Sequence, residues 1–186
     1  MNVEGFNLLF ALLTVVAIAA VVTFTATAIT ARTSERAATF RDDLWDRVSE
    51  VAIPLAFGVG LTATLGSLYY SEVANFPPCE LCWFQRIAMY PMPVLLAVAW
   101  HRGDTHVRRY VMPVALIGAA ISIYHYQLER FPDQGGFSCA VDNPCTLVWV
   151  WMFRFISIPL MALAGFGLIA WLVWIAGQRA EAPARG

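Results

Sequence analysis

Two cysteines stand at the border between a short polar segment and an apolar run, in the stretch Pro77-Pro78-Cys79-Glu80-Leu81-Cys82-Trp83-Phe84-Gln85-Arg86. The apolar run begins near Trp83 and ends near Trp100. A proline suits the first position of a helix, because the N–H that it lacks would have no partner there. The stretch therefore predicts a helix with both cysteines in its first turn, where the helix dipole favours a thiolate.

A Cys-x-x-Cys pair can close a small ring and open it again, which makes it a two-electron switch. Arg86 follows Cys82 by four residues and so lies on the same helical face, one turn deeper. A guanidinium there can hold a thiolate or a polar carbonyl. On this stretch alone, a structural disulfide and half of a zinc site remain open for the cysteines. A side chain that only reaches up to the lipid headgroups remains open for Arg86.

The composition is that of an integral membrane protein. The chain has 186 residues, of which 59% are hydrophobic and 13% charged, whereas a soluble domain carries about 25% charged residues. The apolar residues come in long blocks and not at amphipathic spacing, which predicts membrane-spanning helices in one all-α domain. The formal net charge of −1 gives no sign of a nucleic-acid partner.

Five apolar segments are long enough to span the membrane, and in chain order they are Phe6–Ile29, Val51–Tyr70, Trp83–Trp100, Tyr110–Tyr126 and Trp149–Ile175. Pro91 and Pro93 predict a kink in the third. A cleaved signal peptide is the competing interpretation of the first, but the residues before it offer only Glu4 and no basic residue. We therefore predict a four-helix transmembrane bundle over residues 51–176 with an additional N-terminal transmembrane helix.

The segments outside the bundle are polar. Residues 1–50 combine the first span with a linker, Thr30–Glu50, in which Phe40, Leu44, Trp45 and Val48 recur at helical spacing. This spacing predicts an amphipathic helix lying partly on the cytoplasmic membrane surface, with a solvated linker as the alternative. Residues 177–186 form a cytoplasmic tail.

The arginines assign the two sides of the membrane. Five spans put the linker, the 101–109 turn and the tail on one side, and these hold nine of the twelve arginines. The positive-inside rule places that side in the cytoplasm of a cell (plasma or inner) membrane, with the N-terminus outside and the C-terminus inside. Both cysteine pairs then face the outer, oxidising side, where disulfides persist.

The second pair, Cys139 and Cys145, has five residues between its thiols. A disulfide across it is feasible, although four cysteines allow three connectivities. A zinc site of four thiolates is a further alternative, which the oxidising compartment disfavours, so we predict no metal. Inert structural disulfides are the stronger alternative. Two adjacent pairs favour exchange between them through a mixed disulfide.

The residues from Pro78 to Pro91, together with Tyr124-His125-Tyr126 and the Cys139–Cys145 loop, resemble the disulfide bond formation protein B (DsbB) family. The short second loop looks most like its BdbC branch. The resemblance covers about residues 51–176. The Cys-x-x-Cys-x-x-x-Arg arrangement before a span is fairly specific to it, whereas the loop pair alone is not.

The resemblance implies a membrane enzyme that reoxidises an extracytoplasmic thioredoxin-fold thiol oxidase, similar to DsbA or BdbD. The electrons would pass to a membrane quinone, menaquinone or ubiquinone, and so to the respiratory chain. All four cysteines would be catalytic. Cys82 would touch the quinone with Cys79 as its disulfide partner, Cys139 would be attacked by the reduced partner, and Cys145 would exchange with Cys79.

Two further residues receive a role from the resemblance. Arg86 would hold a quinone oxygen and stabilise the Cys82 thiolate. His125 would line the quinone site, with a satisfied interface histidine as the alternative. The first span has no counterpart in the family, and the short Cys139–Cys145 spacing leaves the order of exchange open. Besides a quinone-linked disulfide oxidase, the sequence leaves open electron transfer in the reductive direction and a structural membrane protein with inert disulfides.

Overall fold

The computed structural model describes residues 3–134, 139 and 143–181. Over these residues the chain is helical, and an isolated bridge between Met152 and Ile156 is the β-structure within them. The all-α prediction is thereby confirmed. The helices in chain order are α1 (Val3–Thr30), α2 (Glu35–Leu68), the π-helical turn η1 (Tyr69–Val73), α3 (Glu80–Met89), α4 (Pro91–Arg102), the 3₁₀ turn η2 (Thr105–Val107), α5 (Arg108–Arg130) and α6 (Ile158–Glu181).

Within the described residues, five helical segments are long and apolar enough to cross a membrane. They are α1, α2 with η1, α3 with α4, α5, and Ile158–Gln178 of α6. This is the predicted set of five spans.

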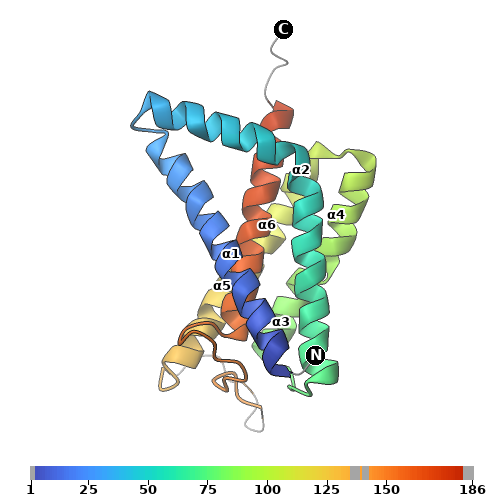
Figure 1. Ribbon diagram of the computed structural model, residues 1–186. Coiled ribbons are helices and arrows are strands. Elements are labelled where there is room, and N and C mark those ends of the chain that lie inside the picture. Colours follow the sequence, from blue (N-terminus) through green and yellow to red (C-terminus); the bar gives the residue numbers. More distant parts are fainter. Residues whose placement is uncertain (1–2, 135–138, 140–142, 182–186) are drawn as a thin grey trace.

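The linker and the second predicted span form one helix, α2. Figure 1 shows its first part running across the end of the molecule before the helix turns into the bundle. Pro54 lies inside α2, and a proline in a helix interior removes a hydrogen bond and bends the helix. The third span is interrupted at one residue, Tyr90, because α3 ends at Met89 and α4 begins at Pro91. The kink predicted from the prolines is therefore present.

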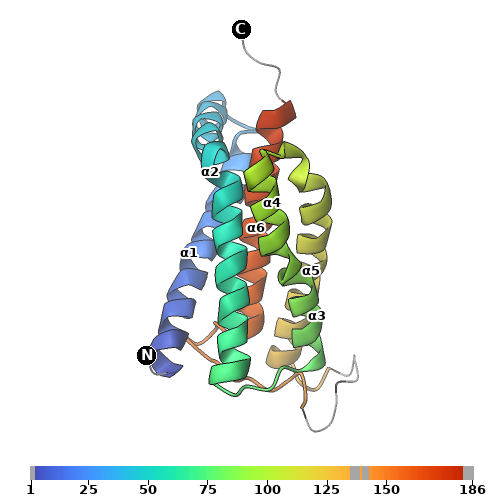
Figure 2. The same cartoon turned by 90° about the vertical axis from the view of Figure 1, so that its right-hand side faces the viewer.

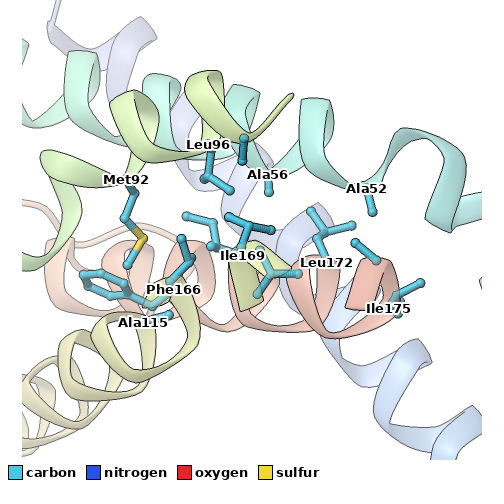
Figure 3. Packing of buried hydrophobic residues seen from close by; sticks show 14 of the residues in the cluster. Ala52, Ala56, Met92, Leu96, Ala115, Phe166, Ile169, Leu172 and Ile175 are labelled. Carbon is cyan, nitrogen blue, oxygen red and sulfur yellow. The ribbon is translucent and has the colours of Figure 1, made fainter. Parts of the chain in front are cut away.

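α6 runs through the middle of the molecule, between the other spans (Figures 1 and 2). Figure 3 shows the packing around it, where α6 side chains meet those of α2, α4 and α5. Phe166 is fully buried, and its ring lies so close to Gly118 of α5 that any side chain there would collide with it. The labelled core consists of Ala52, Ala56, Met92, Leu96, Ala115, Phe166, Ile169, Leu172 and Ile175.

The two ends of the bundle hold different segments. The start of α1, the η1 turn and residues 143–157 before α6 lie at one end, called here the cysteine end (Figure 1). The α1–α2 connection, the α4–α5 connection and the end of α6 lie at the other. The chain is thus divided as the five-span topology requires.

The boundaries of the last two spans differ from the prediction. α5 continues to Arg130, so Gln127–Arg130 is helix and not loop, and α6 begins at Ile158 and not at Trp149. Residues 149–157 form an irregular turn in which Phe153 and Arg154 have φ of 49° and 68°. This turn packs against the end of α5: the Tyr126 hydroxyl donates to the Phe155 carbonyl at 2.9 Å. An apolar composition predicted a span here, but the backbone cannot remain helical at positive φ.

Candidate active site

Cys79 caps the start of α3. Its backbone is extended, with φ −71° and ψ 174°, and the helix begins at Glu80. The Cys82 backbone N–H donates to Cys79 Sγ at 3.4 Å, and the two Sγ atoms are 2.8 Å apart. Both cysteines are thiols here. The cap and first turn of α3 therefore hold the two sulfurs, close to the prediction, although Pro77 and Pro78 precede the helix and do not open it.

A buried polar chain holds Cys79 on one side. Its Sγ lies 3.6 Å from His125 Nε2, and His125 Nδ1 lies 3.3 Å from Gln85 Oε1. Gln85 Nε2 in turn donates to Ser122 Oγ at 2.8 Å. Because the Gln85 oxygen can only accept, Nδ1 is the donor, and Nε2 is left to face the thiol. His125 is only 2% exposed, so this chain fixes its tautomer and ring orientation.

These contacts favour a thiolate at Cys79. The hydrogen bond from the Cys82 thiol is the largest cause that lowers the pKa of Cys79, and the hydrogen bond and charge of His125 lower it further. Burial of Cys79 acts in the opposite direction. The net result is a Cys79 pKa below its ordinary value, which suits a sulfur that must leave or attack in thiol–disulfide exchange.

A cavity of about 20 Å³ lies between this sulfur and the cysteine end, lined among others by Cys79, Cys82, His125 and Glu129. Its size is that of about one water molecule. Glu129 follows His125 by four residues and so shares its helical face. The side chains of Glu129 and His125 thus line one small cavity beside the thiols.

The second cysteine pair meets the first. Cys139 and Cys145 form a disulfide. Cys145 is 2% exposed and packs in one cluster with Cys79 and Leu128, whereas Cys139 is half-buried. Asn143 Nδ2 donates to the Pro77 carbonyl at 3.4 Å, which ties the loop to the segment just before Cys79. The predicted convergence of the two pairs is thus present.

A much larger cavity, of about 460 Å³, lies on the other side of Cys82. Arg86 lines it, and its Nε and Nη2 donate to Ser67 Oγ at 3.0 Å and to the Ser67 carbonyl at 3.1 Å. Tyr90 donates to the same Ser67 hydroxyl at 3.2 Å, and the guanidinium lies 5.3 Å from the centre of the Trp83 ring. Among the described residues, none of the ion pairs involves Arg86. Arg86 therefore presents an uncompensated charge to a largely apolar cavity.

The predicted site residues lie on two cavities. Arg86 lines the large one, Cys79 and His125 line the small one, and Cys82 lines both. The role of His125 at a quinone stays a prediction, since its contact is with Cys79.

The sequence reasoning did not find three participants. Ser67, Gln85 and Glu129 were missed, although Gln85 adjoins Arg86 and Glu129 follows His125 at helical spacing. Ser67 carried no local signal, because α2 brings it to Arg86 from nineteen residues away.

The thiols of Cys79 and Cys82 and a ring nitrogen of His125 lie within 4.8 Å of one another, close enough to hold a metal ion. Cys139 and Cys145 cannot add thiolates to such a site while they are joined in a disulfide. A metal would thus compete with redox chemistry for the same atoms.

Comparison with known proteins extends this picture. The profile of the family described as "Disulfide bond formation protein DsbB" matches residues 49–183. "Disulfide bond formation protein C" of Bacillus subtilis is 46% identical over 125 residues, covering 66% of this chain and 91% of that protein. The "Probable disulfide formation protein" of Deinococcus radiodurans is 42% identical over 139 residues, covering 69% and 90%. No solved structure is a significant match to the chain.

The matched region includes all four cysteines and Arg86, and it begins after α1 and the first part of α2. The match thus covers the bundle that carries the thiols, and the identity to a C-type relative agrees with the short loop between Cys139 and Cys145. This chain belongs to the DsbB family of disulfide bond formation proteins, on its BdbC-like branch.

Proposed function

We propose that this protein is a membrane thiol:quinone oxidoreductase. It reoxidises an extracytoplasmic thioredoxin-fold thiol oxidase and passes the electrons to a membrane quinone, in support of disulfide formation in exported proteins. One observation carries the proposal: the Cys79–Cys82 turn separates a disulfide-bonded loop on one side from a large apolar cavity with a lone arginine on the other.

The large cavity has the donor set that a quinone needs. A quinone has two carbonyl oxygens on an apolar ring. Arg86 can donate to such an oxygen, because its charge has no carboxylate partner among the described residues. Ser67 accepts from the guanidinium, and the Tyr90 hydroxyl donates to Ser67, so the position of the Arg86 side chain is fixed. Bound there beside Cys82, a quinone would supply the capacity to accept two electrons.

The outer pair provides the entry for electrons. A thiolate of the reduced partner attacks Cys139, the more exposed sulfur, and Cys145 leaves as a thiolate. The second partner thiol then attacks the mixed disulfide and releases the oxidised partner. Cys139 and Cys145 are left as a dithiol carrying the two electrons.

The inner pair receives them by two exchanges. Starting from a Cys79–Cys82 disulfide, the Cys145 thiolate attacks Cys79, and Cys82 leaves. Cys139 then attacks Cys145, which restores the outer disulfide and releases Cys79 as a thiolate. When both ring nitrogens of His125 are protonated, Nε2 donates to that leaving thiolate, and the Cys82 sulfur lies 2.8 Å from it. The state described above, with a Cys139–Cys145 disulfide and two inner thiols, corresponds to the product of this exchange.

The arrangement of the bundle supports the predicted orientation. The arginine-rich linker and the α4–α5 connection lie at the end opposite the cysteines, and the positive-inside rule puts basic residues in the cytoplasm. The cysteine end then faces the outer side, where a partner thiol oxidase works. A thiol reagent that cannot cross the membrane should label Cys139, the more exposed sulfur of the outer pair, in whole cells after mild reduction, and labelling of Cys139 only in permeabilised cells would reverse this orientation.

The test uses the purified full chain in lipid nanodiscs, mixed with a reduced thioredoxin-fold oxidase and a quinone. We expect quinol to form as the partner is oxidised, and we expect Cys82→Ser to abolish it. Partner oxidation without quinol would remove the quinone from the proposal. Oxidised partner reduced by added quinol would establish the reductive direction instead. If the purified protein contained one metal ion per chain and showed no redox activity, a metal site formed by Cys79, Cys82 and His125 would be favoured.

A further inference from the structure

We propose that α1 forms the wall of the large cavity that holds the apolar tail of the quinone, an inference that rests on the proposed function. α1 (Val3–Thr30) lies outside the matched residues 49–183, so the family supplies no role for it. The cavity supplies one, because its lining includes α1 residues as well as Cys82 and Arg86.

α1 is packed into the bundle at two glycines of the matched region. The ring of Phe10 lies directly on Gly66 of α2, where any side chain would collide with it. Val21 Cγ2 lies 3.6 Å from the position of a Cβ at Gly167 of α6. Small residues permit this close approach of helices in a membrane. α1 is therefore fixed against α2 and α6, two of the helices that line the cavity.

The face that α1 turns to the cavity is apolar. Phe10, Leu13, Thr14, Val16 and Ala17 line it, and the spacing of three and four residues puts all of these except Val16 on one side of the helix. The Thr14 hydroxyl donates to the Phe10 carbonyl of its own helix at 2.7 Å. The Thr14 hydroxyl proton is therefore not available to a ligand in the cavity. The surface that α1 contributes to the cavity wall is mainly hydrocarbon.

The polar groups gather at the Cys82 end, where Arg86, Ser67 and Tyr90 are joined by hydrogen bonds. Along η1 and α2 the lining extends from Tyr70 back to Pro54, which is about 24 Å along a helix at roughly 1.5 Å per residue. That length is most of the hydrocarbon thickness of about 30 Å. A molecule with a polar ring and a long apolar tail matches this polarity: the ring beside Arg86 and the tail between α1 and α2.

The cavity also has unfilled space at Gly58, which lines it: a Cβ built there meets no atom within 4 Å. Its volume of about 460 Å³ is in the usual range of roughly 300–1,000 Å³ for ligand sites. A lipid acyl chain shares the chemistry of a quinone tail, so the experiment must separate these two occupants.

The first experiment maps the tail directly. The full chain in nanodiscs is irradiated with a quinone that carries a photoreactive group on its tail, and the adducts are located by peptide mass spectrometry. We expect adducts within residues 10–17 of α1 that excess unlabelled quinone removes. Adducts that persist would reveal lipid-type occupancy, and either these or adducts confined to α2 and α6 would overturn the proposal. The proposal would also be overturned if the protein purified from cells had been cleaved so that residues 10–17 were missing.

A quinone with the photoreactive group on its ring separates the two proposals. Ring adducts near Arg86 without tail adducts on α1 would end the role of α1 and leave the oxidoreductase intact. Absence of ring adducts near Arg86 would count against the quinone site itself.

The second experiment compares Ala17→Phe with Ala19→Phe. Ala17 lines the cavity, while Ala19 lies two residues away on the exposed face and is not part of the lining. Because a phenyl group at Ala17 would occupy the space of the tail, we expect the KM for a long-tailed quinone to rise about tenfold in Ala17→Phe. The KM for a tail-less quinone should stay unchanged in both variants. Equal effects of the two substitutions would contradict the proposal.

Gly58→Leu provides an independent variant, since its side chain enters empty space and should not disturb folding. Gly58→Leu should raise the KM for the long-tailed quinone and leave the KM for the tail-less quinone unchanged. If both quinones are affected alike, the cavity serves the ring alone.

Discussion

Cys79 and Cys82 stand three residues apart in one helical turn, yet their surroundings are opposite in kind. Cys79 is buried in a polar chain of His125, Gln85 and Ser122 next to the outer disulfide. Cys82 faces an apolar cavity whose strongest polar group is Arg86. The comparison teaches that a Cys-x-x-Cys turn at the start of a membrane helix can connect two chemistries, because Cys82 lines both the large cavity and the small one beside Cys79.

The largest expected effect is at the sulfurs themselves. Replacing Cys82 by Ser leaves Cys79 without a resolving thiol, so turnover with reduced partner and quinone should fall by about a thousandfold or more. Stopped-flow assays of quinol formation measure it. The outer pair should still accept electrons from the partner once. Normal turnover in Cys82→Ser would show that the two sides are not connected through this turn.

Arg86→Ala tests the cavity side. Removing the guanidinium should raise the KM for quinone by about tenfold or more, because a charge-assisted hydrogen bond to a quinone oxygen is lost. The rate at which reduced partner delivers electrons to the cysteines should change little. Arg154→Ala is the matched control, since Arg154 is an exposed arginine at the same end of the bundle. An unchanged quinone KM in Arg86→Ala would contradict the assignment.

His125→Ala tests the polar side. Without the imidazole, the pKa of Cys79 should rise toward its ordinary value of 9.0, which an ultraviolet titration of the thiolate detects. Transfer from the outer pair should slow, because a less acidic thiol is a poorer leaving group. The KM for quinone should stay constant. A raised quinone KM would support the alternative in which His125 lines the quinone site.

The pH dependence of stability is a smaller effect with a defined sign. A thiol whose pKa is lowered by folding releases its proton more readily in the folded state, so the unfolded state binds more protons. The reduced protein should therefore gain thermal stability as the pH rises toward 9.0 and lose it as the pH falls through the lowered pKa. The protein with an oxidised Cys79–Cys82 pair is the control, because it has no thiol to titrate there. Identical pH profiles of the two forms would show that Cys79 is not acidified.

Gln85→Leu should have the smallest effect on activity, a few-fold slowing of transfer from the outer pair. Gln85 contacts His125 but no sulfur, so its loss frees the ring without removing it. Restoration of the rate in Gln85→Glu, which keeps an acceptor for His125 Nδ1, would separate this positioning role from a packing defect.

The sequence was sufficient for features that depend on local pattern. Long apolar blocks identified the five spans, Pro77 and Pro78 placed the thiols near the start of a helix, and Pro91 predicted the break between α3 and α4. Sequence patterns did not predict features that depend on contacts between distant segments. Residues 149–157 are as apolar as a span, but their backbone turns and packs on the end of α5. The contact between Ser67 and Arg86 joins two helices and has no signature in either.

The relative placement of the two sides was also beyond the sequence. Spacing could not show that His125 meets Cys79 instead of the large cavity, because α5 must first pack against α3. Nor could it show that α1 lines the cavity, since its apolar residues are equally suited to lipid on every face.

The most direct test of the account is the stoichiometry of a single turnover in nanodiscs. The protein is first oxidised and then mixed with an excess of reduced thioredoxin-fold partner and quinone, while partner disulfide and quinol are measured together. The account predicts one quinol for each partner disulfide formed in steady turnover, and in Cys82→Ser it predicts no quinol and one partner disulfide per protein, from the outer pair alone. Partner disulfides that accumulate without matching quinol would contradict it.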